Sequence, residues 1–314
     1  MTSDSFLHSF SGAAGGILAM TATYPLVLLS TRAANETKSE NKSTYRAVVD
    51  LLKRDGFFGL YNGLNSSLLG IAVTNGVYYY FYESARGVIV RSRSGSQALS
   101  TLESMLAGLI AGSATTVLSN PIWVIQTAQT VSGMDAVSAE TPTTVPPPTR
   151  LGLFATAARL LRTGGVAAFF RGLGPALVLV VNPVLQYTIF EQLKNALVRR
   201  RRRTTGRTAI RLTDWDFFLL GAVSKLVATG STYPYIVIKS RLQAGHAAAT
   251  RYRSTLHGLR TIIAEEGIGG IYKGAGPKLL QSVLTAAILF ASQRRIYELT
   301  KVTSLSSSLI LESQ

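Results

Sequence analysis

The sequence predicts an all-α membrane protein with six transmembrane helices in three repeats. Three observations lead to this fold class: long stretches without charge, a proline-centred segment that occurs three times, and a glycine-ending segment that occurs three times. The chain has 314 residues, of which 47% are apolar and 15% are charged. Because an average soluble domain is about 25% charged, this composition indicates a membrane protein.

The uncharged stretches are the candidate transmembrane helices, since about 20 apolar residues cross a bilayer as a helix. One further stretch, residues 217–238, is interrupted only by Lys225. A lysine there is either a functional group or a side chain at a helix interface that extends toward the membrane surface, and the sequence leaves both interpretations open. The other five stretches are residues 9–31, 56–82, 104–134, 172–190 and 279–293.

One proline-centred segment recurs in three of these stretches, as "TATYPLVLLSTR", "VLSNPIWVIQTA" and "STYPYIVIKSR". Proline in a helix interior removes a backbone hydrogen bond and bends the helix, at a cost of about 3 kcal/mol. Small residues precede the prolines at fixed distances, and two glycines four positions apart let a neighbouring membrane helix approach closely. We therefore expect kinks at Pro25, Pro121 and Pro234, and helix-packing positions at Gly12, Gly16, Gly108, Gly112, Gly221 and Lys225.

The second repeated segment reads "DGFFGLYNG", "GGVAAFFRG" and "EGIGGIYKG". Apolar residues precede each copy at helical spacing, which predicts a short amphipathic helix at the membrane surface in each repeat. In the second and third copies they are Phe154, Ala157, Leu160, Leu161, Leu256, Leu259, Ile262 and Ile263. We place repeat 1 at residues 1–98, repeat 2 at 99–207 and repeat 3 at 208–314, with an exposed proline-rich loop at 135–150.

The charge balance and the rare residue types exclude several classes of protein. A net charge of +16 suits a protein that faces anionic lipid or handles an anionic cargo, and no motif of a known nucleic-acid-binding module occurs. The chain has no cysteine, so disulfides and thiolate metal sites are excluded. None of its three histidines has metal or triad spacing, and no phosphate loop or nucleophile elbow is present. We expect neither an enzyme nor a bound cofactor.

The repeated segments resemble the mitochondrial carrier family over essentially the whole chain. Its signature is Pro-x-acid-x-x-base-x-base, followed by a loop and an acid-Gly segment that ends in aromatic-base-Gly. The resemblance implies six helices around a pseudo-threefold axis and a central cavity that opens alternately to each side. It also implies that the three prolines bring the ends of the odd-numbered helices together at the cavity's inner mouth, and that a monomer suffices.

Three further segments look like the peroxisomal branch of that family: "NPIWVIQT", "GPALVLVVNPVLQYTIFE" and "KGAGPKLLQSVLTAAILF". This narrower resemblance implies a transporter of a nucleotide-type anionic cofactor (ATP or AMP, NAD, FAD or coenzyme A) across the peroxisomal membrane. Two alternatives stay open at this point. One is a mitochondrial inner-membrane carrier of another small anion, and the other is a scaffold of the carrier fold without transport activity.

The chain departs from the family's signature at the inner mouth. The acid positions hold Val27, Trp123 and Ile236. The first basic positions hold Ser30, Gln126 and Lys239, and the second basic positions hold Arg32, Ala128 and Arg241. Because no acid remains to pair with Lys239, we expect this mouth to close on apolar packing and hydrogen bonds.

At the opposite mouth the family uses aromatic-acid-x-x-base on the even-numbered helices. The resemblance assigns gate roles to Glu83 with Arg86 and to Glu191 with Lys194, whereas the third copy has Arg294 in place of an acid. Each pair also has a purely structural interpretation, because an acid and a base three or four apart stabilise a helix by about 0.2–0.5 kcal/mol.

The family's central contacts lie about two turns beyond the last glycine of each landmark. The fourth helix is one residue shorter between landmarks than the others, so its register stays open. Amides suit hydrogen bonds to a base or ribose, and a lysine suits phosphate. The resemblance and nearby polar residues together give the substrate-binding candidates Gly70, Ile71, Asn75, Leu179, Val180, Asn182, Gln186, Lys278 and Gln281.

A run of five arginines, Arg199 to Arg203, is predicted to lie in the loop between the fourth and fifth helices. One interpretation is a solvated basic loop that holds anionic lipid. The other is a targeting address read by a peroxisomal import receptor. The sequence does not decide between them.

Overall fold

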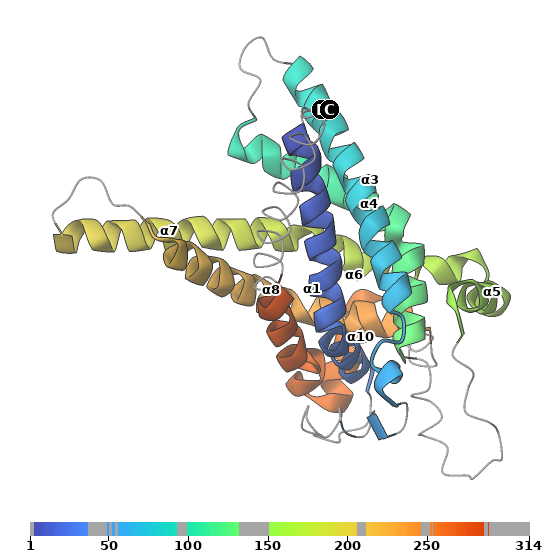
Figure 1. The fold of residues 1–314 in the computed structure, drawn as a ribbon. Helices are drawn as coiled ribbons and strands as arrows, with labels where there is room; N and C mark the ends of the chain where they lie inside the picture. Colours follow the sequence, from blue (N-terminus) through green and yellow to red (C-terminus); the bar gives the residue numbers. More distant parts are fainter. Residues whose placement is uncertain are drawn as a thin grey trace, which may run out of the picture. The chain divides into compact units, whose positions relative to one another are not determined.

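The computed structural model describes residues 3–36, 49, 52–53, 56–92, 99–131, 151–205, 212–245, 252, 254–285 and 288. Every regular element within these ranges is a helix, which confirms the all-α fold class (Figure 1). The elements are α1 (Ser3–Asn35), α3 (Leu64–Arg91), α4 (Thr101–Val131), α5 (Leu153–Gly164), η2 (Val166–Phe170), α6 (Leu173–Val178), η3 (Leu179–Val181), α7 (Asn182–Thr205), α8 (Asp214–Ala244), α10 (Thr255–Glu266) and η4 (Ile268–Tyr272).

The chain forms two compact units, which are described separately below. The first unit comprises Met1–Ser30, Lys42–Leu64 and Gly276–Gln314, and the second comprises Thr31–Asn41 and Asn65–Ala275. In the described ranges, Gly15–Asn35, Thr101–Val131 and Val166–Thr204 are long and apolar enough to cross a membrane. The proline-rich loop at 135–150, most of the first repeat's surface helix and much of the stretch 279–293 lie outside the described residues.

The three predicted kink prolines lie inside α1, α4 and α8 without ending them. In all three repeats, the side chain just before the proline donates a hydrogen bond to the carbonyl just before the landmark's last glycine. The bonds run from Tyr24 Oη to Asn62 O (2.7 Å), from Asn120 Nδ2 to Arg171 O (3.3 Å) and from Tyr233 Oη to Lys273 O (3.1 Å). The two sequence landmarks are therefore in contact within every repeat.

The landmark glycines are required by their backbone conformation. Gly56, Gly63, Gly165, Gly172, Gly267 and Gly274 all have φ between 60° and 88°, a region that other residues adopt only with strain. At Gly172 the space is limiting as well, because an added Cβ would lie 3.0 Å from the carbonyl oxygen of Lys239 on α8. Each turn thus leads the chain closely past a proline-containing helix and into the next membrane helix.

The amphipathic helices α5 and α10 bury only part of their predicted apolar sets. Leu160 on α5 and Ile262 on α10 are buried, with Ala157 and Leu259 packed beside the same cores. The outer members of each set, Phe154, Leu161, Leu256 and Ile263, are exposed. Exposed apolar residues on such helices suit the lipid boundary, and the prediction of surface helices is consistent with this pattern.

Helices α7 and α8 pack against each other (Figure 1), and side chains join them at two points. Near one end, Asn182 Nδ2 donates to the carbonyl of Ala228 (3.1 Å) and to Thr232 Oγ1 (2.7 Å). Near the other, both terminal nitrogens of Arg201 donate to the Asp216 carboxylate at 2.6 Å. Mainly through the Arg201 hydrogen bond, the pKa of Asp216 falls to about 2. The two helices therefore run antiparallel.

The arginine run differs from its prediction, because Arg199 to Arg203 belong to α7 and not to a loop. Arginine is a strong helix former, and no glycine or proline interrupts the chain between Pro183 and Gly206. Cations in the last turn also interact favourably with the helix dipole. Arg201 is held by Asp216, while the other four arginines are exposed.

Candidate functional site

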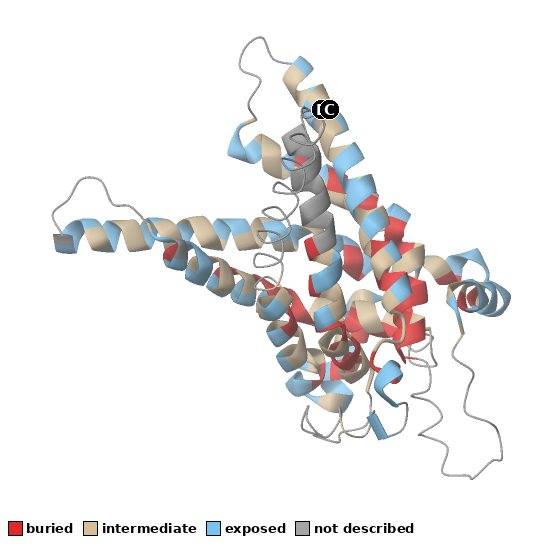
Figure 2. Cartoon of the chain, viewed as in Figure 1, coloured by how far each residue is buried: buried red, intermediate tan, exposed pale blue. Residues whose placement is uncertain are grey.

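The C-terminal ends of α4 and α8 and residues 31–36 close one end of the second unit. Figure 2 shows buried residues gathered along the C-terminal half of α4. Arg32 Nε donates to the carbonyl of Thr130, and Arg241 Nε donates to the carbonyl of Ala34, both at 2.8 Å. The accepting residue lies two positions beyond the second basic position of another repeat in both cases. The two bonds are thus equivalent under the repeat symmetry of the sequence.

The corresponding third arginine is absent, because that position holds Ala128. Gln243, two residues beyond Arg241, makes the link between α8 and α4 instead. Its amide donates to Asn120 Oδ1 (3.2 Å) and accepts a bond from Thr127 Oγ1 (3.3 Å). Hydrogen bonds to carbonyls and amides therefore hold this end together where the family signature has acid–base pairs.

Behind this end, Arg241 forms a buried ion pair that fastens α10 to α8. Its two terminal nitrogens contact the Glu266 carboxylate at 2.5 and 2.8 Å, and Lys273 Nζ contacts the same carboxylate at 2.8 Å. The Arg241 side chain is 1% exposed and that of Glu266 8%. Burial acts to raise the pKa of the Glu266 carboxyl, but the hydrogen bonds from Arg241 and Lys273 outweigh it and hold that pKa below its ordinary value.

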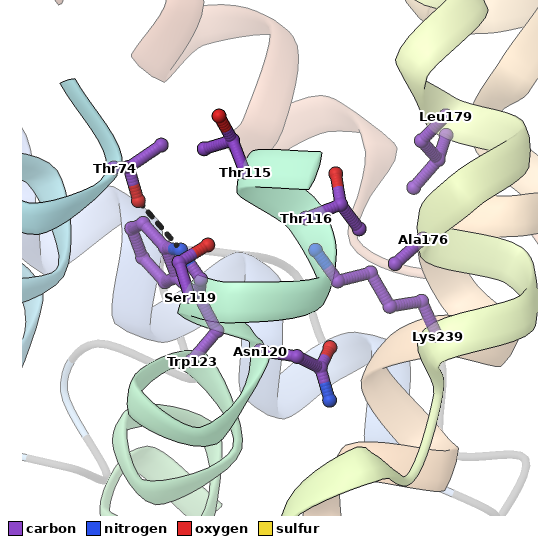
Figure 3. Close-up of a pocket in the computed structure, with 9 residues that line it drawn as sticks. All are labelled: Thr74, Thr115, Thr116, Ser119, Asn120, Trp123, Ala176, Leu179 and Lys239. Carbon is purple, nitrogen blue, oxygen red and sulfur yellow. Dashed lines mark hydrogen bonds between the residues drawn. The ribbon is translucent and has the colours of Figure 1, made fainter. Parts of the chain in front are cut away.

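A polar cavity of about 220 Å³ lies directly above the closed end, between α3, α4, α6 and α8 (Figure 3). Lys239 enters it from α8 with its ammonium group directed toward α4, and Trp123 of α4 donates from Nε1 to Thr74 Oγ1 of α3 at 3.1 Å. The lining residues are Thr74, Thr115, Thr116, Ser119, Asn120, Trp123, Ala176, Leu179 and Lys239.

Two polar groups in this wall have no partner among the described residues. Thr115 is 4% exposed, and its hydroxyl makes no hydrogen bond. Lys239 forms no ion pair or hydrogen bond through its ammonium group with any part of the chain that the structure describes. A buried hydroxyl and a lysine left unpaired in one cavity are costly, so both groups are available to an anionic ligand.

A larger cavity of about 520 Å³ adjoins the polar one and shares Thr74, Thr115, Thr116 and Leu179 with it. Its wall is mainly apolar and includes two tyrosine rings, from Tyr78 of α3 and Tyr187 of α7. Tyr78 also stacks on Tyr82, with ring centroids 5.9 Å apart. The second unit thus offers a cationic, hydroxyl-lined floor beside an apolar chamber with aromatic walls.

The predicted substrate-binding residues lie in several different places. Leu179 and Val180 line the cavities, and Gly70 packs against the Trp123 ring, where an added Cβ would lie 3.3 Å from the indole. Lys278 and Gln281 belong to the other unit, where Gln281 Nε2 donates to Thr285 Oγ1 at 2.9 Å.

Asn182 lines neither cavity, and its amide donates hydrogen bonds to α8, so its substrate-binding role stays a prediction. Asn75 is exposed and lines neither cavity, whereas its neighbour Thr74 lines both. Ile71 and Gln186 also line neither cavity. The Asn182 amide meets α8 because α7 packs along that helix.

The helix-packing glycines behave differently from one another. An added Cβ at Gly112 would lie 2.6 Å from Val180, and one at Gly108 would lie 3.4 Å from Tyr78 Oη, so both mark close approaches to α4. Gly16 and Gly221 have no described atom within 4 Å of that position, so a packing role for these two glycines stays a prediction. The surroundings of Gly12 lie outside the described residues.

Lys225, in the same motif, is half-buried on α8 and lines neither cavity. The predicted outer gate residues pair within their own helices. Arg86 lies 3.1 Å from Glu83, and Lys194 lies 2.6 Å from Glu191. This is the geometry of the structural interpretation, and an outer gate role for these residues stays a prediction. Gln126 of the inner mouth donates to Thr130 Oγ1 at 2.9 Å.

Sequence reasoning missed the polar side chains that α4 contributes to the floor: Thr115, Thr116, Ser119 and Asn120. A signal for them was present, since residues at i, i+1, i+4 and i+5 share one face of a helix. Four polar residues on one face of an otherwise apolar span indicate a surface that lines a wet cavity.

Comparison with known proteins matches the family model described as mitochondrial carrier protein to residues 2–93, 97–201 and 211–304. The chain is 34% identical to the peroxisomal nicotinamide adenine dinucleotide carrier of Arabidopsis thaliana, over 96% of this chain and 97% of the relative. It is 30% identical to peroxisomal membrane protein PMP34 of Mus musculus over 91% of both chains. It is also 30% identical to peroxisomal adenine nucleotide carrier 1 of Arabidopsis thaliana, over 96% of this chain and 93% of the relative.

Proposed function

The chain belongs to the mitochondrial carrier family, and from that premise we propose that it transports a nucleotide-type anionic cofactor across the peroxisomal membrane. The observation that carries this proposal is the pair of adjoining cavities, one with a lysine and hydroxyls and the other apolar with tyrosine walls. The relatives named as peroxisomal NAD and adenine nucleotide carriers support both the class of cargo and the membrane.

The cavities match the two chemical parts of a nucleotide. A phosphate group suits the floor, because lysine binds phosphate as a point charge and hydroxyls donate to its oxygens. An aromatic base suits the chamber, because stacking on a tyrosine ring stabilises it beyond the burial of area alone. ATP, AMP, NAD, FAD and coenzyme A all combine these parts.

Transport in this proposal proceeds by alternating access, as in other carriers of the family, and involves no chemical reaction of the cargo. The cargo enters the cavities while Arg241 joins α8 to Ala34 at the end of α1, Arg32 joins that same segment to α4, and Gln243 joins α8 to α4. Its release on the other side requires these bonds to break. Pro121 and Pro234 lie inside these helices, and the kinks predicted there would direct the helix ends that must separate.

The experiment is uptake of labelled ATP, AMP, NAD, FAD and coenzyme A into liposomes that contain the purified protein, with and without nucleotide inside. We expect saturable uptake of at least one of these cofactors, and dependence on internal nucleotide would identify exchange. Absence of uptake of all five, from protein with a cooperative melting transition, would contradict the proposed cargo. Such a result would favour another small anion or a scaffold.

The peroxisomal location is tested separately by the arginine run on α7. Because Arg201 holds Asp216, the informative variant changes the four exposed arginines, Arg199, Arg200, Arg202 and Arg203, to serine and leaves Arg201 in place. Peroxisomal staining of the tagged wild-type chain is expected, and its loss in the variant would support an import address. Mitochondrial staining of the wild-type chain would contradict the location.

A further inference from the structure

Lys239 occupies a basic position of the family's inner gate, but the acidic positions of that gate hold no acid. The three signature acid positions hold Val27, Trp123 and Ile236, and one of them, Trp123, lines the same cavity as Lys239. An acid there would share the cavity with the lysine. The Trp123 indole instead packs on Gly70 and donates a hydrogen bond to Thr74. The described residues that line the two cavities include no aspartate or glutamate.

Lys239 is also the one cation among the residues that line the two cavities in the described part of the chain. Arg241, two residues further along α8, is committed to Glu266 and to the carbonyl of Ala34. Gln243 bonds Asn120 just beyond the floor. The ammonium group of Lys239 therefore lies between the cargo cavity and the hydrogen bonds that close the end.

We propose that a phosphate of the cargo takes the place of the missing gate carboxylate, binding the Lys239 ammonium group together with the unpaired Thr115 hydroxyl. This inference rests on the proposed function and adds a specificity-determining residue to it. Cargo that carries a phosphate group is then strongly preferred, since without it a half-buried cation stays unpaired beside the closing end.

The physical reason is the cost of an uncompensated charge. A lysine removed from water and left without a counter-ion is destabilising, whereas a charge-assisted hydrogen bond to a phosphate oxygen is short and strong. The buried Thr115 hydroxyl adds a second donor on the facing helix α4. A nucleoside without phosphate brings no negative charge to the Lys239 ammonium group.

The first test compares adenosine with AMP and ATP in liposomes that contain wild-type protein, Lys239→Gln or Lys239→Arg. Removing one partner of a buried charge pair costs enough to weaken binding about 30-fold or more. We expect Lys239→Gln to raise the KM for the nucleotides by at least that factor without a matching change for adenosine, and Lys239→Arg to restore much of the preference. Thr115→Val, which keeps the shape of the side chain, is expected to raise the nucleotide KM less.

The second test places an acid in the cavity. Ser119 is buried in its wall, and Ser119→Asp and Ser119→Asn add the same bulk but differ in charge. If the cargo supplies the missing negative charge, the aspartate should pair with Lys239 and suppress nucleotide uptake far more than the asparagine. Nucleotide-induced thermal shifts of the same variants report binding independently of transport.

Equal nucleotide preference in wild type and Lys239→Gln would overturn the inference while wild-type uptake upheld the proposed function. Equal effects of aspartate and asparagine at position 119 would also overturn it, because bulk alone would then explain the loss. Failure of the wild-type protein to take up any nucleotide would instead contradict the proposed function itself. If a variant does not unfold cooperatively, the conclusion is drawn from the variants at the other position, 239 or 119. Each outcome then bears on either the inference or the proposed function.

Discussion

The second and third repeats both fasten their surface helices to the membrane helices through an apolar cluster, but the third adds an ion pair that the second lacks. In the third repeat, Arg241 of α8 forms a buried ion pair with Glu266 at the end of α10. In the second, the two matching positions hold Ala128 and Gly164, and the interface of α4 with α5 and η2 is an apolar cluster of Val124, Ile125, Leu160 and Ala168. The joint is thus apolar in both repeats, and the third repeat adds a buried ion pair at its edge.

A third position, Lys273 in one repeat and Arg171 in the other, shows why the loss of the base and the loss of the acid occur together. Lys273 of the third repeat contacts Glu266, whereas its counterpart Arg171 lies over the empty position, with Nη2 2.8 Å from where a Cβ of Gly164 would be. Loss of the acid or the base alone leaves a buried charge without its partner, which costs about 3–5 kcal/mol. Loss of both leaves a site that apolar packing can fill.

The largest expected effect comes from breaking the ionic joint with Glu266→Gln. Arg241 would then stay buried without a carboxylate, and we expect a loss of about 3–5 kcal/mol in the free energy of unfolding. Thermal unfolding in detergent measures it. The matched control is Glu265→Gln on the exposed neighbouring position, for which a change of at most about 0.5 kcal/mol is expected. Equal melting of both variants would show that the joint contributes little.

Acid should weaken the same joint without a mutation. Because the pKa of Glu266 is lower in the folded protein than its ordinary value of 4.5, its ionised form stabilises the fold above pH 4.5, and this contribution is lost as the pH falls through the folded pKa. The melting temperatures of wild type and Glu266→Gln should therefore differ by a constant amount above about pH 5 and converge at lower pH. A difference that persists unchanged in acid would contradict the assignment.

Building the joint in the second repeat is the converse experiment, with Ala128→Arg and Gly164→Glu. Each single variant adds an unpaired charge, whereas the double variant can form the pair and also meet Arg171. Contacting residues show coupling energies of about 0.5–3 kcal/mol, and we expect a favourable value in a double-mutant cycle of unfolding. Simple additivity would mean that the apolar cluster has closed the site to an ion pair.

The smallest effects concern the hydrogen bond that all repeats share. Tyr24→Phe and Tyr233→Phe each leave a carbonyl without its side-chain donor, and a loss of about 1 kcal/mol is expected for each. Tyr235→Phe, on the same helix as Tyr233, is the control because that hydroxyl makes no such bond with the described residues. A cost in only one of the two tyrosine variants would break the equivalence of the repeats.

The landmark glycines could be predicted from the sequence, whereas the hydrogen bond that each landmark accepts could not. The landmark glycines were predictable because their positive φ admits few other residues. The shared hydrogen bond was not, because its donors are Tyr24, Asn120 and Tyr233, and any side-chain donor of suitable reach can make it. The repeat bounds at 98/99 and 207/208 stay a prediction.

The register of the fourth helix was undecided for a related reason. The structure places a 3-10 segment, η3, between α6 and α7. A 3-10 helix rises about 2.0 Å per residue against 1.5 Å for an α-helix. Over Leu179–Val181, the gain equals about one α-helical residue, which accounts for the shorter spacing between landmarks. The 3-10 segment also rotates every later side chain, Asn182 among them, relative to the direction that a uniform α-helix would give it.

The two arginine-to-carbonyl bonds at the closed end have a consequence for energy coupling. A carbonyl oxygen carries no ionisable proton, and a guanidinium keeps its charge at every physiological pH. The bonds from Arg32 and Arg241 to Thr130 and Ala34 thus have the same strength on the acidic and the alkaline side of a membrane. A proton gradient therefore does not change the strength of these two hydrogen bonds. Any sensitivity of transport to a proton gradient must arise from the cargo or from other groups.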